Sequence, residues 1–446
     1  MKLYDVLAAA ASECGPAPSR LAADLRRVVA VDNALSGLDV WNGDYDSLVA
    51  AYASDASEPM VTGLVLTMNE EESIGRCIGS AVRDCTGTVV LDSGSTDGTP
   101  ENARAVSETV KVVSRAWPDS FSGQRNHAIT LVDDGWLFFI DADEYVRPAD
   151  QGALRPVLRV LDFLLPRQDF LVSPWLADVG SGHVATNTRK IFRRNAPFRF
   201  MGDIHERPYL PDGSSPPWIE LDFGMEHTGY QPEVVTAKNK ADRSRTMIGS
   251  CRTAEPRNPK WVHYETRDVL LPAVRTPEDA RAAYDHLRSS LPWYDRPGIR
   301  DYEADQLIDA TILLCDLALR FGGREEIALH GSSLSDLGRP VEAAYYAAVV
   351  EFGSAMTVLN RIPSRLEQAA DSATPDAATT LGKIRELQAM VSLSSGDYAA
   401  AVAFHDQAAS FGCGESVRDS MDRARAAFAR PSPSSVRGNG SESPSA

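Results

Sequence analysis

The 446-residue sequence has no long apolar run. None of its apolar stretches approaches the roughly 20 residues that a membrane-spanning helix requires. Near the N-terminus, Ala8–Ala11 is soon followed by Ser, Glu, Cys and Pro instead of an uninterrupted apolar core, so we expect no signal peptide. The six cysteines lack the spacing of metal ligands or of a disulfide framework. Together these absences predict a cytoplasmic protein without a membrane span.

Positive charge is also in deficit, since the formal net charge is −17. This acidity argues against nonspecific binding to nucleic acid or to anionic membranes, so we expect no nucleic-acid partner. An anionic ligand such as a nucleotide would need a locally positive binding site. A bound metal ion, a helix N-terminus or a few placed arginines are the options.

Two glycine-rich nucleotide motifs are missing as well. After the first predicted strand, a dehydrogenase would carry Gly-x-Gly-x-x-Gly, but Thr67–Glu70 (Thr-Met-Asn-Glu) stands there instead. The Gly-Lys-Ser/Thr signature of a phosphate-binding loop is absent too. These absences argue against a dinucleotide-dependent dehydrogenase and against a nucleotide-hydrolysing motor.

The most informative stretch present is Trp136–Glu144, in which five bulky apolar residues run into Asp-Ala-Asp-Glu. The apolar run predicts a buried strand. Because side chains alternate along a strand, we expect Asp141 and Asp143 on one face, with Ala142 pointing away. Two adjacent carboxylates favour a positive group between them, and a divalent cation is the natural candidate. The alternative is a pair of solvated acids in a turn.

Strands and helices alternate over the first half of the chain. Predicted strands at Val61–Leu66, Thr88–Leu91 and Val110–Val113 precede the strand that ends at Asp141, and helical segments separate them. This alternation predicts an α/β fold with a mainly parallel sheet. Ligands of such sheets bind beyond the carboxyl ends of the strands. We therefore expect the side chains that follow these strands to converge, namely those of Asn69, Asp92 and Asp141.

Composition divides the chain into four predicted parts. Residues 1–57 form a helical segment with stretches such as Leu21–Ala30, residues 58–232 the α/β domain, 233–430 an all-α domain, and 431–446 a disordered tail. Within 233–430, the segments that begin at Leu334 and Leu393 resemble one another. Each predicts two helices joined by a small-residue turn, with Phe-Gly at the end (Phe352-Gly353 and Phe411-Gly412).

Several motifs now resemble those of a known family. Val65–Glu70, Leu91–Thr99, Gln124–Ala128 and Ile140–Glu144 are similar, in this order, to the motifs of family 2 glycosyltransferases with a GT-A fold. Phe200–Glu206 and Glu226–Tyr230, followed by a helical region, resemble the subgroup with tetratricopeptide-like repeats. The resemblance implies a nucleotide-diphospho-sugar transferase domain over 58–232 and a tetratricopeptide-like domain over 233–430.

The resemblance also implies roles for individual residues. Asp143 and His227 would bind Mg²⁺ or Mn²⁺ that bridges the diphosphate of a nucleotide-sugar. The predicted donor-binding residues are Thr67, Asn69, Glu70, Asp92, Arg125, Asp141 and Ala142. Structural roles are the alternatives: an Asx-turn at Asp92, helix capping at Asn69 and Glu70, a surface position for Arg125, and a core or loop position for His227.

Sugar transfer with inversion needs a base that deprotonates the acceptor on the face opposite the leaving diphosphate. Glu206 is the predicted base, His205 the second candidate and Asp203 the third. A structural turn with a satisfied histidine is the alternative for this segment.

The sequence thus predicts a metal-dependent inverting glycosyltransferase that uses a nucleotide-sugar, with a UDP-sugar as the expected donor. The acceptor is left open between a peptide side chain and a small natural product. The helical region could contact the acceptor, form a homodimer or buttress the catalytic domain. Two other functions remain as alternatives: a catalytically inert helical-repeat scaffold, and a sugar nucleotidyltransferase.

Overall fold

The computed structural model describes residues 1–13, 18–228, 240–359, 361–371 and 378–422. The chain divides into two compact units, Met1–Phe321 and Gly322–Ala446. The domain limits predicted after residues 57, 232 and 430 stay predictions. The tail predicted to be disordered, 431–446, lies outside the described residues.

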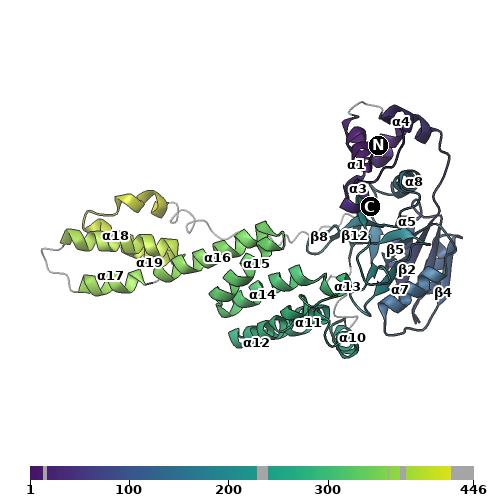
Figure 1. Ribbon diagram of the computed structural model, residues 1–446. Coiled ribbons are helices and arrows are strands. Elements are labelled where there is room, and N and C mark those ends of the chain that lie inside the picture. Colours follow the sequence, from purple (N-terminus) through teal and green to yellow (C-terminus); the bar gives the residue numbers. More distant parts are fainter. Residues whose placement is uncertain (14–17, 229–239, 360, 372–377, 423–446) are drawn as a thin grey trace, which may run out of the picture. The chain divides into compact units, whose positions relative to one another are not determined.

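Within the described residues, a mixed sheet of ten strands lies at the centre of the first unit (Figure 1). Its strands, with those of a separate hairpin, are β1 (Val28–Val31), β2 (Val61–Thr67), β3 (Gly87–Asp92), β4 (Val110–Ser114), β5 (Trp136–Asp141), β6 (Glu144–Val146), β7 (Leu171–Asp178), β8 (Val184–Ala185), β9 (Ile191–Arg193), β10 (Arg199–Met201), β11 (Arg207–Tyr209) and β12 (Trp218–His227). The main path runs β1-β12-β7-β9-β5-β2-β3-β4, while β6 pairs with β12 and β8 with β7. The hairpin consists of β10 and β11.

Four neighbouring strands of this sheet are parallel, with β2 between β3 and β5, and β4 beyond β3. Thr67 at the end of β2 is level with Asp92 at the end of β3, and Leu66 is level with Asp141 at the end of β5. The carboxyl ends of three strands therefore lie along one edge, where ligands of such sheets bind. This confirms the shared edge that the strand–helix alternation predicts.

Both faces of the parallel strands are buried, as their continuous apolar sequences require. On β5, Trp136, Phe138 and Ile140 join the core on one face of the sheet, and Leu137 and Phe139 join the core on the other. The helices that follow these strands are α5 (Ile74–Ala81), α6 (Thr99–Val106), α7 (Phe121–Thr130) and α8 (Leu154–Leu164). They bury side chains at helical spacing against these cores.

The first 57 residues contain helices, as predicted, but also a strand. Their helices are α1 (Leu3–Ser12), α2 (Arg20–Leu25), α3 (Asn33–Ser36) and α4 (Tyr45–Ala53). The expectation of helix through Leu21–Ala30 was wrong, because α2 ends at Leu25 and β1 pairs antiparallel with β12 from Val28 onwards. β-Branched valines favour an extended backbone, and the edge of β12 offers it hydrogen-bonding partners.

A buried ion pair attaches this N-terminal segment to α8. Arg159 Nη2 lies 2.6 Å from Asp24 Oδ2, and Arg159 Nε donates to the Tyr52 hydroxyl at 3.1 Å. Arg159 Nη1 also lies 3.0 Å from Glu58 Oε1. The Arg159 and Asp24 side chains are only 10% and 11% exposed. Removing one partner would leave the other charge buried without compensation.

We expect Arg159→Ala to lower the free energy of unfolding by about 3–5 kcal/mol, measured by urea denaturation. Arg155→Ala is the matched control, because Arg155 lies on the same helix and pairs with Glu58 at 3.0 Å in a more exposed setting. Such surface pairs contribute about 0–1 kcal/mol. Equal losses for the two variants would contradict a structural role for the buried pair.

Helices follow β12 in the remainder of the first unit. They are α10 (Lys240–Ala254), α11 (Pro259–Glu265), the π-helical turn η1 (Thr266–Leu270), the 3₁₀ turn η2 (Leu271–Ala273), α12 (Pro277–Arg288), the 3₁₀ turn η3 (Leu291–Trp293), α13 (Asp301–Ala304) and α14 (Leu307–Phe321). Trp261 and Tyr264 of α11 share a buried cluster with Ile204 and Tyr209 of the hairpin region. This cluster packs the helices against the segment that carries the predicted base.

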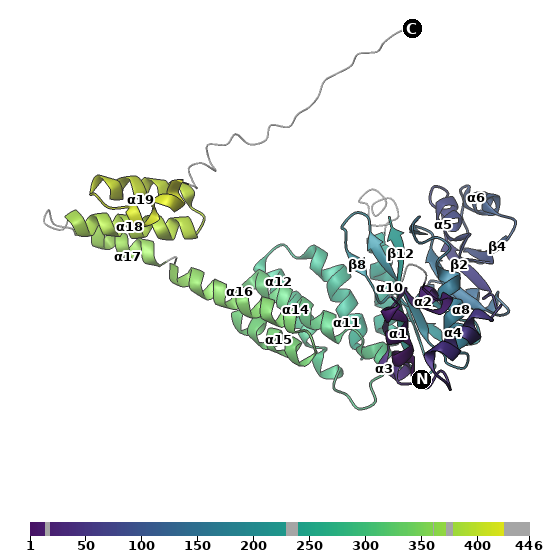
Figure 2. The ribbon, with the colours of Figure 1, turned by 90° about the horizontal axis from the view of Figure 1, so that it is seen from above.

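The second unit is helical in its described residues. It contains α15 (Arg324–Asp336), α16 (Pro340–Leu359), α17 (Ile362–Asp371), α18 (Ala378–Ser394), α19 (Tyr398–Ser410) and the 3₁₀ turn η5 (Glu415–Val417). Gly338 links α15 to α16 and Gly396 links α18 to α19, each with a positive φ (74° and 82°). Each glycine therefore closes a left-handed helix cap. Figure 2 shows α18 and α19 side by side.

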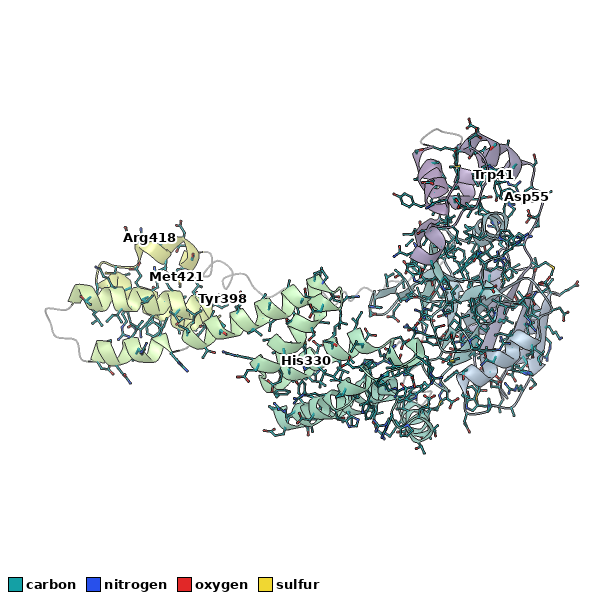
Figure 3. The ribbon with its side chains drawn as sticks, viewed as in Figure 1. Trp41, Asp55, His330, Tyr398, Arg418 and Met421 are labelled. Carbon is teal, nitrogen blue, oxygen red and sulfur yellow. The ribbon has the colours of Figure 1, made fainter. Side chains whose placement is uncertain are left out.

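The two similar segments are thus both helix–turn–helix units, as predicted. The predicted ending at Phe352-Gly353 was wrong, because α16 continues through these residues to Leu359; apolar and alanine-rich sequence on either side sustains the helix. The second ending holds, since α19 stops at Ser410, just before Phe411. Met421, labelled in Figure 3, is fully buried with Ala401. The tetratricopeptide-like character of this region stays a prediction.

No helix in the described parts of the chain has both the length and the apolarity that crossing a membrane requires. The five described cysteines form no disulfide with one another.

Candidate active site

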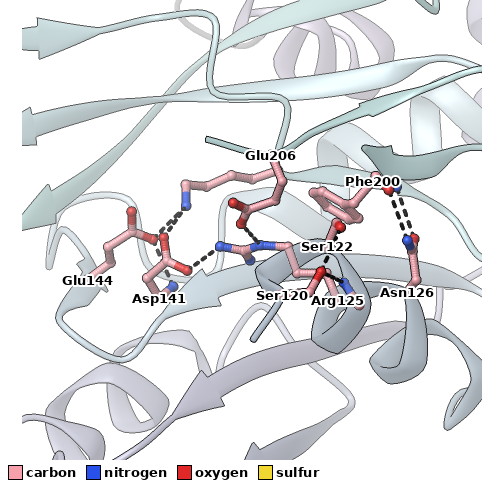
Figure 4. A network of polar contacts seen from close by, with 10 residues as sticks. Ser120, Ser122, Arg125, Asn126, Asp141, Glu144, Phe200 and Glu206 are labelled. Atoms are coloured by element: carbon pink, nitrogen blue, oxygen red, sulfur yellow. Dashed lines mark hydrogen bonds and ion pairs between the residues drawn. The ribbon is translucent and has the colours of Figure 1, made fainter. Parts of the chain in front are cut away.

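A buried arginine joins two acidic residues at the carboxyl edge of the sheet. Arg125, on α7, donates from Nη2 to Asp141 Oδ1 at 2.7 Å and from Nε to Glu206 Oε1 at 2.6 Å (Figure 4). Its side chain is 11% exposed and its guanidinium lies over the rings of Phe139 and Phe200. Burial opposes the charged form, but the two carboxylates outweigh it and raise the pKa of Arg125. Arg125 is therefore a fixed cation, and its predicted alternative as a surface residue was wrong.

A lysine that sequence reasoning missed completes this network. Lys190, which directly precedes β9, donates from Nζ to Glu144 Oε2 at 2.8 Å and to Asp141 Oδ2 at 3.3 Å. Burial would raise the pKa of Asp141, but Arg125 and Lys190 outweigh burial and lower that pKa strongly. Glu144 is more deeply buried, and burial raises its pKa to about 7. The sequence signal was weak: a basic pair, Arg189-Lys190, leading into an apolar strand.

Asp143 lies in a different environment from Asp141. The predicted shared strand face was wrong, because β5 ends at Asp141 and a turn at Ala142 and Asp143 separates the two carboxylates. Asp143 Oδ2 lies 3.4 Å from His227 Nε2, at the end of β12. His227 is level with Asp178 of the parallel neighbour β7, and its Nδ1 lies 3.4 Å from Asp178 Oδ2. Burial would lower the pKa of His227, but Asp143 outweighs burial and raises it.

These side chains suit a hard divalent cation as part of a ligand set. Two donors about 2.1 Å from an octahedral Mg²⁺ are about 3 Å apart, close to the 3.4 Å between Asp143 Oδ2 and His227 Nε2. Asp178 at Nδ1 is the kind of carboxylate that orients a ligating imidazole. The described residues contain no group of three or more such side chains poised around a metal. A cation here would therefore complete its shell with substrate phosphate and water.

Asp92 and Thr67 stand at adjacent strand ends. Asp92 is 4% exposed, and its carboxylate accepts from the backbone N–H groups of Gly94 and Ser95 at 3.2 Å each. This is the Asx-turn that the sequence left as the alternative. Thr67 is buried, and its Oγ1 has no hydrogen-bond partner among the described residues. The donor-binding roles of both residues stay predictions.

Asn69 and Glu70 hold the loops that border this edge. Asn69 has a left-handed backbone (φ 56°), and its Oδ1 accepts from the Thr96 N–H at 2.8 Å. Glu70 accepts from the Ser73 hydroxyl at 2.9 Å, and its own N–H donates to Thr99 Oγ1 at 2.7 Å. Neither contact is the helix cap that was left as the alternative: Ser73 is the N-cap of α5, without a side-chain cap hydrogen bond, and the Asn69 contact lies in the loop before α6. A direct part in nucleotide binding stays a prediction for both.

The three candidate bases occupy the loop between β10 and β11 and face different neighbours. Glu206 reaches Arg125 and thereby Asp141. His205 Nε2 lies 2.7 Å from Asp268 Oδ2, on η1. Asp203 accepts through its backbone oxygen from the Phe121 N–H at 2.8 Å, and its Oδ2 accepts from Cys251 Sγ at 3.9 Å. Within the described residues, Glu206 is the one of the three that ion pairs connect to an acid at a strand end, through Arg125 to Asp141.

Comparison with known proteins agrees with this architecture. Residues 64–163 match the family model of glycosyl transferase family 2. This stretch is a family 2 glycosyltransferase domain. The chain is similar to the SPbeta prophage-derived glycosyltransferase SunS of Bacillus subtilis, with 29% identity over 356 residues, 80% of this chain and 81% of SunS.

Two further similarities extend beyond that domain. The TPR repeat-containing protein Synpcc7942_0270 of Synechococcus elongatus is 27% identical over 207 residues, which cover 43% of this chain and 48% of that protein. Among solved structures, S. aureus TarS 1–349 aligns over 65% of this chain and 87% of its own, with 14% identity and a TM-score of 0.29.

The predicted family, the enzyme class and the fold class are confirmed: the protein is a glycosyltransferase. A domain with a mixed sheet of mostly parallel strands precedes an all-α region. Arg125, Asp141, Asp143 and Glu144 all lie within the family 2 match, whereas Lys190, Glu206 and His227 lie beyond it.

Lys190 should be essential for the stability of this glycosyltransferase domain. We expect Lys190→Met to lower the free energy of unfolding by about 3–5 kcal/mol, because Glu144 and Asp141 would lose a buried cation. Lys111→Met, at an exposed position on β4, should change it by less than about 0.5 kcal/mol. Urea denaturation measures both. A Lys190→Met protein as stable as the Lys111→Met control would show that the acids need no cation there.

Proposed function

We propose that the protein is a metal-dependent, inverting glycosyltransferase that moves a sugar from a nucleoside diphosphate, with UDP as the expected nucleotide, to a nucleophilic acceptor. One observation carries the proposal. At the same edge of the sheet, separate ion pairs hold two acidic groups apart: Asp143 with His227, and Glu206 with Arg125. The Asp143–His227 pair is suited to bind a cation, and the Glu206 carboxylate is suited to take a proton from the acceptor.

Asp143 and His227 would hold Mg²⁺ or Mn²⁺, with Asp178 orienting the imidazole. When bound, such a cation acts as a Lewis acid that stabilises the negative charge developing on the leaving diphosphate. The predicted residues fit this role by the chemistry of their donor atoms. A local cation would also let a chain with a formal charge of −17 bind a polyanionic donor.

Glu206 would act as the base. As the acceptor atom attacks the anomeric carbon, its proton passes to the Glu206 carboxylate and the bond from that carbon to the diphosphate oxygen breaks. The diphosphate departs with the bonding electron pair, and the configuration at the carbon inverts. Arg125 binds Glu206 through Oε1 and shares its charge with Asp141, so that the carboxylate is held in place from one side.

The strand ends would bind the nucleotide. The parallel register sets Thr67 level with Asp92, and the adjacent Leu66 level with Asp141. Asn69 and Glu70 shape the loops beside these strand ends. Ala142 is buried in the turn between the two acids. We propose that Asp141 faces the ribose, while Arg125 fixes its carboxylate.

The acceptor remains a choice between a peptide side chain and a small molecule. The helical second unit is the part of the chain that could bind an extended acceptor or a second copy of the protein, since helical repeats present long surfaces.

Metal-dependent donor binding tests the first half of the proposal. We expect UDP-glucose with Mn²⁺ to raise the melting temperature of the protein, and UDP-glucose without metal to do so far less, because a ligand that binds only the folded state stabilises it. Asp143→Asn should remove the metal-dependent part of the shift. Asp133→Asn, at an exposed turn position before β5, is the control and should keep it.

If the metal leaves the shift unchanged, or if Asp143→Asn keeps the full shift, Asp143 is not the metal ligand. A protein that binds no nucleotide-sugar under either condition would favour the inert scaffold. Formation of a nucleotide-sugar from a sugar phosphate and a nucleoside triphosphate would favour the nucleotidyltransferase.

Turnover measurements test the proposed role of Glu206 as the base. Glu206→Gln keeps an oxygen for Arg125 but cannot accept the acceptor proton, so we expect kcat for metal-dependent UDP release to fall by about 10²–10⁴-fold. Donor affinity should stay near that of the wild type. Glu108→Gln, at an exposed surface position, serves as the control. Full turnover by Glu206→Gln would exclude Glu206 as the base.

A further inference from the structure

The loop that presents Glu206 has an unusual backbone. It joins β10 to β11, whose register pairs Met201 with Arg207, so five residues make the connection. Gly202 and His205 both adopt positive φ, 94° and 51°. A residue with a Cβ, such as His205, pays free energy for this left-handed conformation, which persists only where surrounding contacts enforce it.

Those contacts come from one helical segment outside the family 2 match. The His205 ring stacks on the ring of Tyr264, with centroids 3.8 Å apart and planes 12° apart. Its Nε2 lies 2.7 Å from Asp268 Oδ2. Tyr264 is in α11, and Asp268 lies four residues further on in the π-helical turn η1, which continues α11 directly. The segment of α11 and η1 therefore holds the His205 imidazole by stacking on its face and by a polar contact at its edge.

Asp268 is itself held in one orientation. Arg267 Nε donates to Asp268 Oδ1 at 2.6 Å and Arg267 Nη2 donates to Oδ2 at 3.1 Å. Burial would raise the pKa of Asp268, but hydrogen bonds from His205 and Arg267 lower it to about 2. An ionised carboxylate only accepts, so His205 donates from Nε2. This nitrogen is thus engaged in holding the loop.

Glu206 follows His205 directly, and its carboxylate meets Arg125 at 2.6 Å. A change in the His205 backbone would therefore move the Glu206 carboxylate relative to Arg125 and Asp141. Rates of group transfer are sensitive to such displacements, since a misplacement of about 1 Å can lower a rate by about 10²-fold. π-Helical turns are also frequent at functional sites, because their extra residue redirects side chains.

We propose that Asp268 is a positioning residue of the active site: through its hydrogen bond to His205 it fixes the 202–206 loop in the conformation that aims Glu206 at the acceptor. This inference rests on the proposed role of Glu206 as the base. It assigns the helical region a part in the chemistry that the family 2 domain cannot supply by itself. It also makes His205 a link in the structure instead of a proton acceptor.

The test begins with a measurement that needs no turnover. Amide hydrogen exchange of the peptide that contains residues 202–206 should become at least several-fold faster in Asp268→Ala and in His205→Ala. It should stay at the wild-type rate in Asp285→Ala, a control at an exposed position of α12, where Asp285 pairs with Arg281. Melting temperatures show that all variants remain folded. Unchanged exchange in Asp268→Ala would overturn the positioning role, whatever the reaction proves to be.

Turnover then separates positioning from a direct catalytic role. With UDP-glucose and Mn²⁺, we expect Asp268→Ala to lower kcat for UDP release by about 10- to 100-fold while KM for the donor changes by less than about 3-fold. Asp268→Asn, whose amide oxygen can still accept from His205, should recover most of the rate. His205→Ala and the double variant should lose no more than Asp268→Ala, because the two residues act as one unit.

A much larger loss in His205→Ala than in Asp268→Ala would overturn the proposal by giving His205 its own part in proton transfer. A loss confined to KM would overturn it as well. Failure of the proposed function is recognised separately: full activity of Glu206→Gln in the same assay refutes Glu206 as the base, while the exchange measurement still decides whether Asp268 holds the loop.

Discussion

The buried guanidinium of Arg125 is the interaction on which the geometry of the site depends. It joins Asp141, at the end of a sheet strand, to Glu206, in a loop more than sixty residues later in the chain. Both ion pairs are short, and the guanidinium lies over the neighbouring rings of Phe139 and Phe200. In such surroundings an unpaired carboxylate would be costly, so each acid stabilises the position of the other. The sheet edge and the loop are thereby held as one constellation.

Separate electrostatic environments distinguish the acids of the Asp-Ala-Asp-Glu stretch. Asp141 and Glu144 share Lys190, and Asp141 also binds Arg125. Asp143 faces His227, at the end of β12 on the same edge of the sheet. The turn at Ala142 and Asp143 therefore divides the three neighbouring acids into two groups with different partners. Protein cations neutralise one group, which leaves the other as the place where an external cation fits the surrounding donor atoms.

The sequence predicted those features that local patterns determine. Continuous apolar runs with helical segments between them were sufficient for the parallel strands β2, β3, β4 and β5, and hence for the shared edge at Asp92 and Asp141. The order of motifs was sufficient for the family. The failures have a common physical origin: the face of Asp143 depends on where β5 ends, and the partner Lys190 depends on an antiparallel strand whose pairing no local pattern specifies. Asp268 acts through a π-helical turn, which has no sequence signature comparable to a cap or a hairpin turn.

The pairing of β1 with β12 has a consequence for shortened forms of the protein. One side of β12 pairs with β7 at both ends of the strand, with an irregularity between Glu220 and Gly224. On the other side, β6 pairs with the end near His227 and β1 with the start, from Ile219 to Leu221. A chain cut back to the start of β2 would expose the backbone donors and acceptors at that start. Unprotected strand edges recruit strands from other molecules. The N-terminal segment thus covers this edge of β12 through β1 and protects the protein from self-association there.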